Sequence, residues 1–103
     1  MAAIIITYRL LPGVTPADFE DWVAKVDQPT MRGIERVKSF DTYRITGPLM
    51  GDGEPSIQYV EVFDVPDIAG FTGKDMAGPA VQSVIGQFMG FADSPEFMLA
   101  EKL

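Results

Sequence analysis

The run Ile4-Ile5-Ile6-Thr7-Tyr8-Arg9-Leu10 decides the fold. β-Branched and aromatic residues favour strands, and the first half of this run is apolar at both odd and even positions. A strand with that pattern is buried on both faces, so the run predicts a central strand of a sheet. Helices would cover one face of that sheet, and the other face needs a different cover.

An amphipathic helix is predicted directly after this strand. Thr15-Pro16 supplies an N-cap residue followed by a proline at the first helical position. Apolar residues then recur at spacings of three and four, at Phe19, Trp22, Val23 and Val26. We expect this helix to fray near Gln28-Pro29, because the residue before a proline is disfavoured in helical geometry.

Three further strands and a second main helix complete the pattern. Strands are expected over residues 37–46, 57–63 and 96–103, and a turn-forming segment containing Gly51-Asp52-Gly53 joins the first two as an antiparallel pair. A short helical turn is expected over residues 68–71, and a helix begins at Pro79. The order βαββαβ predicts one α+β domain over residues 1–103. Its fold is ferredoxin-like, with both helices on one face of a four-stranded antiparallel sheet.

The other face of this sheet is expected to be bare and apolar, because isoleucines point to both sides of the first strand. Wide exposed apolar surfaces promote association. We therefore expect the bare face to pack on a second copy of the chain, which gives a homodimer.

Composition excludes several classes of function. Among 103 residues there is no cysteine and no histidine, which removes thiolate nucleophiles, Cys- or His-ligated metals and histidine bases. Fifteen acidic and eight basic residues give a net charge of −7, which disfavours nucleic acid. The sequence shows neither a membrane-spanning apolar run nor the basic start of a signal peptide. We expect a cytoplasmic protein without nucleic-acid or membrane partners.

Three segments together carry a resemblance to a known family: residues 4–20, the stretch Tyr59-Val60-Glu61-Val62, and residues 91–99. The chain resembles the RedY-like (HapK-like) proteins of the dimeric α/β-barrel superfamily, found in prodiginine-type pigment and related bacterial natural-product pathways. The resemblance implies a cytoplasmic homodimer with a pocket between sheet and helices in each protomer. It also implies cofactor-free chemistry on an aromatic or polyketide-like intermediate, by proton transfer, cyclisation or oxygen insertion. Several superfamily members use a pocket histidine, which this chain lacks, so no catalytic residue is carried over.

Glu61 is the first candidate catalytic residue. It shares strand parity with Ile57, Tyr59 and Phe63, so it faces the interior if that side meets the helices. A desolvated carboxylate there would titrate near neutrality and could serve as a general base. The alternative is that Glu61 forms an ion pair with an arginine across the strand or across a dimer interface.

The other candidates are polar or aromatic residues of the strands and helices. Arg9 and Arg44 could clamp a carboxylate or an enolate oxygen, and Tyr43 and Tyr59 could donate hydrogen bonds to a ligand carbonyl. Surface ion pairs and rim packing are the alternatives for these four. Pocket lining is predicted for Trp22, Tyr8 and Phe88, with ordinary core packing as the alternative. An adaptable apolar wall is predicted from Met76, Met89, Met98, Phe88, Phe91 and Phe97.

Three functions stay open at this point. The first is a cofactor-independent enzyme of secondary metabolism that acts on an apolar conjugated intermediate by proton transfer or cyclisation. The second is a non-catalytic accessory protein that binds such an intermediate, and the third is a cofactor-free monooxygenase. None of the three requires a metal or an organic cofactor.

Overall fold

The computed structural model describes residues 2–103. In chain order the elements are β1 (Ala2–Leu10), α1 (Pro16–Trp22), the π-helical turn η1 (Val23–Asp27), α2 (Gln28–Arg32), β2 (Ser39–Arg44), β3 (Tyr59–Asp64), α3 (Ile68–Gly73), the 3-10 turn η2 (Asp75–Ala77), α4 (Pro79–Phe88) and β4 (Ala92–Glu101). None of the helices within residues 2–103 is long and apolar enough to cross a membrane.

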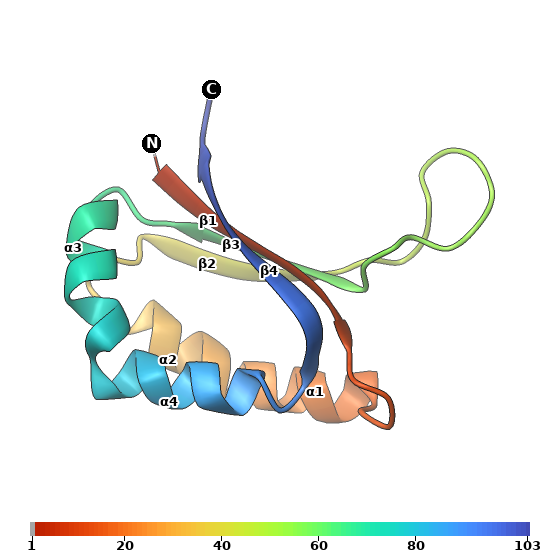
Figure 1. Ribbon diagram of the computed structural model, residues 1–103, viewed down its shortest axis with the longest axis horizontal. Helices are drawn as coiled ribbons and strands as arrows, with labels where there is room; N and C mark the ends of the chain where they lie inside the picture. The colour runs from red at the N-terminus through yellow and green to blue at the C-terminus, as the bar shows by residue number, and fades with distance from the viewer. Residues whose placement is uncertain (1) are drawn as a thin grey trace.

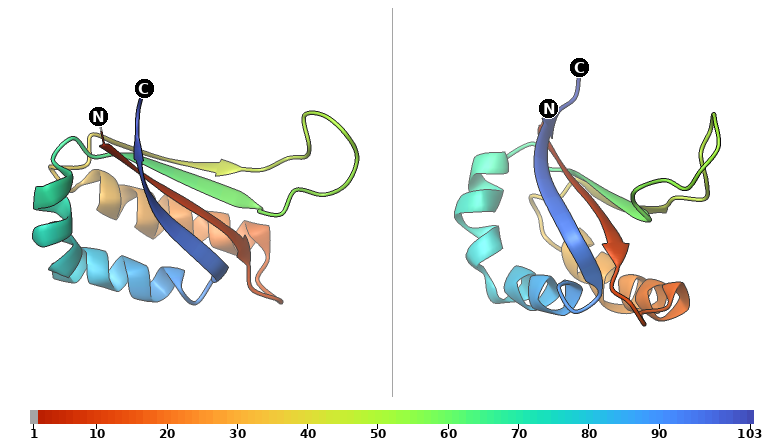
Figure 2. Two further views of the ribbon diagram at one scale, coloured as in Figure 1. Left: turned by 45° about the horizontal axis from the view of Figure 1, so that its top comes forward. Right: turned by 45° about the vertical axis from the view of Figure 1, so that its right-hand side comes forward.

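The four strands form one antiparallel sheet in the order β2-β3-β1-β4. Helices α1, α2 and α4 run along one face of this sheet, and α3 links the sheet to that helical layer at one end (Figure 1). Two further views show the opposite face without a helix (Figure 2). The α+β, ferredoxin-like βαββαβ prediction is confirmed, and β1 is a central strand as its composition predicted.

Strand parity separates the two faces of the sheet as predicted. In β3, Tyr59, Glu61 and Phe63 are buried, while Val60 and Val62 are half-buried. Glu61 lies opposite Ile6 of β1, which is also buried, so this parity faces the helices. Glu61 therefore enters the interior between sheet and helices.

The first helix does not fray at Gln28-Pro29, and the prediction of its end was wrong. The chain passes through η1 and continues as α2 to Arg32. At the end of η1 the Gln28 amide donates to the Val23 carbonyl, five residues back. This wider turn places Pro29 in the first turn of α2, where its missing N–H is not needed.

The last strand also begins earlier than predicted, at Ala92 rather than Glu96. Its pairing with β1 shifts register between Thr7 and Arg9, and Ser94 has a positive φ of 50°. This irregularity, together with the position of β4 at the sheet edge, accommodates Pro95 within the strand. Phe97 and Leu99 of β4 pair with Ile6 and Ile4 of β1 on the helix side.

The connection between β2 and β3 extends away from the body of the protein (Figure 1). Gly51 and Gly53 in this connection have φ of 78° and 99°, a conformation that L residues with side chains rarely adopt. The predicted hairpin role of Gly51-Asp52-Gly53 is confirmed.

Candidate functional site

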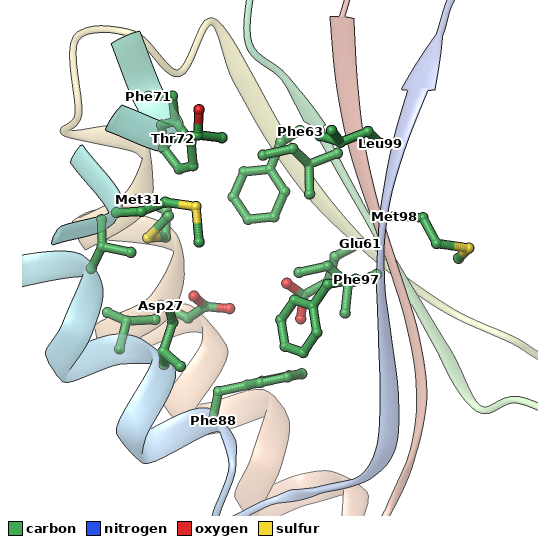
Figure 3. Close-up of a pocket in the computed structure, with 16 residues that line it drawn as sticks. Asp27, Met31, Glu61, Phe63, Phe71, Thr72, Phe88, Phe97, Met98 and Leu99 are labelled. Atoms are coloured by element: carbon green, nitrogen blue, oxygen red, sulfur yellow. The ribbon is translucent and has the colours of Figure 1, made fainter. Parts of the chain in front are cut away.

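A cavity of about 280 Å³ lies between the sheet and the helices. This volume is near the lower end of ligand sites, which are typically about 300–1,000 Å³. The side chains that line it come from strands and helices on all sides (Figure 3), and they are Ile4, Ile6, Asp27, Met31, Glu61, Phe63, Phe71, Thr72, Met76, Val81, Val84, Ile85, Phe88, Phe97, Met98 and Leu99.

The cavity opens to solvent beside β4. Phe97 and Leu99 are 52% and 70% exposed, and Met76 of η2 is also exposed, whereas Phe63, Phe71 and Phe88 are buried. The exposed residues therefore lie at the mouth and the buried ones form its interior. Of the predicted apolar wall, Met76, Phe88, Phe97 and Met98 line the cavity, and Met89 and Phe91 do not.

Two carboxyl groups enter this apolar cavity. Glu61 comes from β3 and Asp27 from η1, and each residue is only 2% exposed. Their side chains point toward one another between the aromatic residues of the cavity (Figure 3). Within the described part of the chain, no lysine or arginine lines the cavity, so the pair has no counter-charge there.

Glu61 holds its proton more tightly than an ordinary glutamate. Burial is the main cause and the charge of Asp27 adds to it, so the pKa of Glu61 is raised to about 8. The Tyr8 hydroxyl donates a hydrogen bond of 2.5 Å to Glu61 Oε2, which acts in the opposite direction. The predicted interior carboxylate is thus present, and within residues 2–103 Glu61 forms no ion pair with an arginine of its own chain.

Asp27 is the second buried acid, and the sequence analysis did not identify it. Burial raises its pKa to about 7. Its Oδ2 atom is buried and has no hydrogen-bond partner among residues 2–103. A signal existed, because Asp27 follows Val23 by four residues and therefore continues the apolar side of the first helix.

Tyr8 supports Glu61 from within the core. Its ring stacks on the ring of Tyr59, with ring centroids 5.7 Å apart. It also makes T-shaped contacts with Phe19 and Phe88, with centroid distances of 5.7 Å and 4.8 Å. Burial and the neighbouring Glu61 carboxylate raise the pKa of Tyr8, so its hydroxyl stays protonated and acts as a donor. Phe88, in turn, packs on Tyr8 and lines the cavity.

A second polar cluster lies outside this cavity. Arg44 donates two hydrogen bonds to Glu20, of 2.6 Å and 2.8 Å, and the Tyr59 hydroxyl donates to Glu20 Oε2 at 2.8 Å. These donors lower the pKa of Glu20 to about 2, with Arg44 as the main cause. The structure therefore groups Tyr59 and Arg44 with Glu20 rather than with Glu61.

The family model of the REDY-like protein HapK matches residues 2–103. The chain belongs to this family. Among solved structures, HapK from Hahella chejuensis is 30% identical with a TM-score of 0.80, over 100% of this chain and 93% of that chain. The comparison with curated proteins gave no match.

Two more distant structures share the fold of this REDY-like protein. A dimeric ferredoxin-like protein of unknown function from Thermobifida fusca is 16% identical, with a TM-score of 0.73 over 98% of this chain and 90% of that chain. A mutant form of SnoaB, a cofactor-independent oxygenase from Streptomyces nogalater, is 14% identical, with a TM-score of 0.74 over 98% and 91%. At these identities the likeness concerns the fold alone.

The remaining predicted site residues of this REDY-like protein lie away from the cavity. Arg9 is exposed and donates to the Pro55 carbonyl at 3.2 Å. Tyr43 pairs with Val60 on the open face of the sheet and is 56% exposed. Trp22 packs in the core beside Phe19 and Phe91, and its indole N–H donates to Gln87. The cavity thus brings together Glu61 and Phe88, with Tyr8 directly behind them.

Metal binding finds little support in this geometry. The described residues contain no group of three or more Asp or Glu side chains that could hold a metal ion. Two desolvated carboxyls in an apolar cavity are instead suited to holding and transferring a proton.

Proposed function

We propose that the protein is a cofactor-independent enzyme of bacterial secondary metabolism that transfers a proton on a small, apolar, conjugated metabolite. Glu61 is the base, and Tyr8 orients its carboxylate through the hydroxyl hydrogen bond. The observation that carries the proposal is the pair of desolvated carboxyls, Glu61 and Asp27, inside an otherwise apolar cavity.

The proton affinity of this pair matches such a role. With pKa values near 8 for Glu61 and near 7 for Asp27, the pair holds and exchanges protons close to neutral pH. A general base is most effective when its pKa lies near the working pH. It then has a high affinity for the substrate proton, and a useful fraction of it is still ionised and able to accept that proton. In a chain without histidine, desolvation of carboxyls achieves what an imidazole would otherwise provide.

The reaction starts with removal of a proton from a C–H group next to a ligand carbonyl. The C–H electron pair becomes the enolate, and the proton goes to the Glu61 carboxylate. Return of that proton at another atom isomerises the ligand. Alternatively, the enolate carbon attacks a second carbonyl within the same molecule, the C=O π bond of that carbonyl opens to an alkoxide, and the alkoxide takes the proton back from Glu61 to give the cyclised hydroxyl product. Both outcomes are balanced without an oxidant or a reductant.

The functional unit in this proposal is a cytoplasmic homodimer formed through the open sheet face. Ile5, Val60 and Val62 on that face are only half-buried in the single chain. An apolar strip at the centre of a sheet favours association. The Thermobifida fusca protein with this fold is described as dimeric, which supports the proposal.

An oxygenase is the second candidate, because SnoaB is described as a cofactor-independent oxygenase and has the same fold. In that case the enolate or phenolate formed by Glu61 would react with molecular oxygen. The two candidates share the proton-removal step and differ in whether oxygen is consumed. An accessory protein that only binds the metabolite would show neither activity.

Deuterium exchange tests the proton-transfer step without knowledge of the natural metabolite. The substrate is β-tetralone, a benzo-fused cyclic ketone with acidic C–H groups, incubated in deuterated water and followed by mass spectrometry. We expect the wild-type protein to accelerate exchange. The Glu61→Gln variant should lose roughly 100-fold or more, as is typical when a general base is removed. Glu54→Gln, in the exposed hairpin loop, is the matched control.

Three other results would change the assignment. Equal exchange rates for wild type and Glu61→Gln would remove Glu61 as the base. Binding of the ketone without any acceleration would favour the accessory role. Oxygen uptake with a hydroquinone substrate, measured with an oxygen electrode, would favour the oxygenase.

A further inference from the structure

We propose that the cavity selects ligands that carry a positively charged nitrogen on an apolar ring system. This inference rests on the site described under the proposed function and names the class of molecule that the site accepts. It is carried by the charges, the unused hydrogen-bond acceptors and the apolar walls of the cavity.

The cavity has two acidic groups and no basic one among its described lining residues. The arginines of the helical side are engaged elsewhere. Arg44 bonds to Glu20, Arg36 bonds to Asp67 and Asp75, and Arg32 bonds to the Phe40 carbonyl. Within residues 2–103, no cation therefore neutralises Glu61 and Asp27, and an anionic ligand would be repelled.

The two carboxyls also receive fewer hydrogen bonds than they can accept. An ionised carboxylate offers about four acceptor positions, so the pair offers about eight. The described structure supplies the Tyr8 hydroxyl to Glu61 and nothing to Asp27 Oδ2. Buried acceptors without donors are costly, and a ligand with N–H groups would satisfy several of them at once. A charged nitrogen supplies both the missing donors and the missing charge.

The remaining walls point to an organic cation rather than a metal ion. Apart from the two acids and Thr72, every lining side chain is apolar. A hard divalent cation such as calcium needs about six to eight oxygen ligands, which this lining does not provide. Phe63, Phe88 and Phe97 instead lie around the carboxyls (Figure 3), where they can contact an aromatic ring and the edge of a cation.

Binding of such a ligand is coupled to proton release. The titratable groups that face the Glu61 carboxyl are Tyr8 from β1 and Asp27 from η1, while α3, α4 and β4 contribute no titratable side chain to the lining. Without a ligand, burial favours the protonated carboxyls. A cation favours their ionised forms, so protons leave as it binds and its affinity increases with pH.

The test compares three probes with one ring system: α-naphthylmethylamine, which is cationic, α-naphthylmethanol, which is neutral, and α-naphthoate, which is anionic. Isothermal titration calorimetry at about pH 8 measures their affinities for the full chain. We expect the amine to bind at least about tenfold more tightly than the alcohol, and the naphthoate to show no binding at roughly millimolar concentration. The amine should lose affinity at about pH 6 and the alcohol should not.

Two variants examine whether the carboxyls cause this preference. In Glu61→Gln and in Asp27→Asn the advantage of the amine over the alcohol should fall to about threefold or less, while the alcohol keeps its affinity. In Glu54→Gln the advantage should be unchanged. Retained alcohol binding shows that the variants are folded around an intact cavity.

Several results would overturn the inference. These are equal affinity of amine and alcohol for the wild-type protein, tighter binding of naphthoate, an amine preference that survives both carboxyl substitutions, or no binding of any probe. The probes carry no acidic C–H group, so these results are independent of catalysis. Deuterium exchange into β-tetralone without an amine preference would leave the proton-transfer proposal intact and reject this one.

Discussion

Replacement of Glu61 by glutamine should make the stability of the protein less dependent on pH. Glu61 is 2% exposed, and burial raises its pKa from 4.5 to about 8. The folded protein therefore holds this proton more tightly than the unfolded chain. The stability from this group is complete below about pH 4.5 and is lost progressively as the pH rises to about 8, by about 1.4 kcal/mol per pH unit.

The magnitude follows from these two pKa values. At pH 7 the cost to the wild-type protein is about 3 kcal/mol, which is a large fraction of the stability of a typical domain. Glutamine has nearly the same shape and does not ionise. The free energy of unfolding of the variant should therefore exceed that of the wild type by up to about 3 kcal/mol at pH 7. At pH 5 this difference should be about 2 kcal/mol smaller.

Urea unfolding provides the measurement. Trp22 is the single tryptophan and is buried, so its fluorescence reports loss of the core. Titrations are run between pH 5 and pH 8 at one protein concentration, because association would otherwise change the apparent stability. Glu54→Gln, in the exposed loop, should follow the wild type at every pH. A difference between Glu61→Gln and wild type that does not widen with pH would refute the desolvation argument.

Three further predictions concern other single substitutions. Asp27→Asn should also have a higher free energy of unfolding than the wild type, and this difference should be larger at pH 8 than at pH 5, because burial raises the pKa of Asp27 to about 7. Urea titrations at the two pH values check this. Arg36→Met should cost about 1 kcal/mol in global stability, since its ion pair with Asp67 is largely exposed and its pair with Asp75 is still partly exposed. Hydrogen exchange should nevertheless become faster in α3, and unchanged exchange would contradict this. Phe19→Ala, at a fully buried position, should cost about 3–5 kcal/mol by urea unfolding.

The fold was accessible from the sequence because local patterns and topology agree. The two-sided apolar character of Ile4–Ile6 indicated a central strand, and β1 does pair with both β3 and β4. Parity in β3 was enough to place Glu61 on the helix side. Period and parity are properties of neighbouring residues, so they can be recognised without knowledge of distant contacts.

The residues of the site could be predicted only in part from the sequence. Strand parity predicts the face of the sheet on which a side chain lies, but not where along that face it lies relative to the cavity. Tyr59 and Glu61 share a face of β3, yet Tyr59 bonds to Glu20 near the sheet edge and Glu61 lies in the cavity. Asp27 was missed for a different reason. Its place depends on a π turn that carries the helix past Pro29, and the sequence pattern indicated an end to the helix instead.

In the proposed mechanism, function and stability are opposed at the two buried carboxyls. The desolvation that brings the pKa of Glu61 to about 8 makes it a base suited to neutral pH, and the same desolvation destabilises the folded protein above about pH 5. The Glu61→Gln variant should accordingly be more stable and less active. A charged ligand that supplies N–H donors to Glu61 and Asp27 would remove part of this cost, so it should stabilise the wild-type protein more than either carboxyl variant.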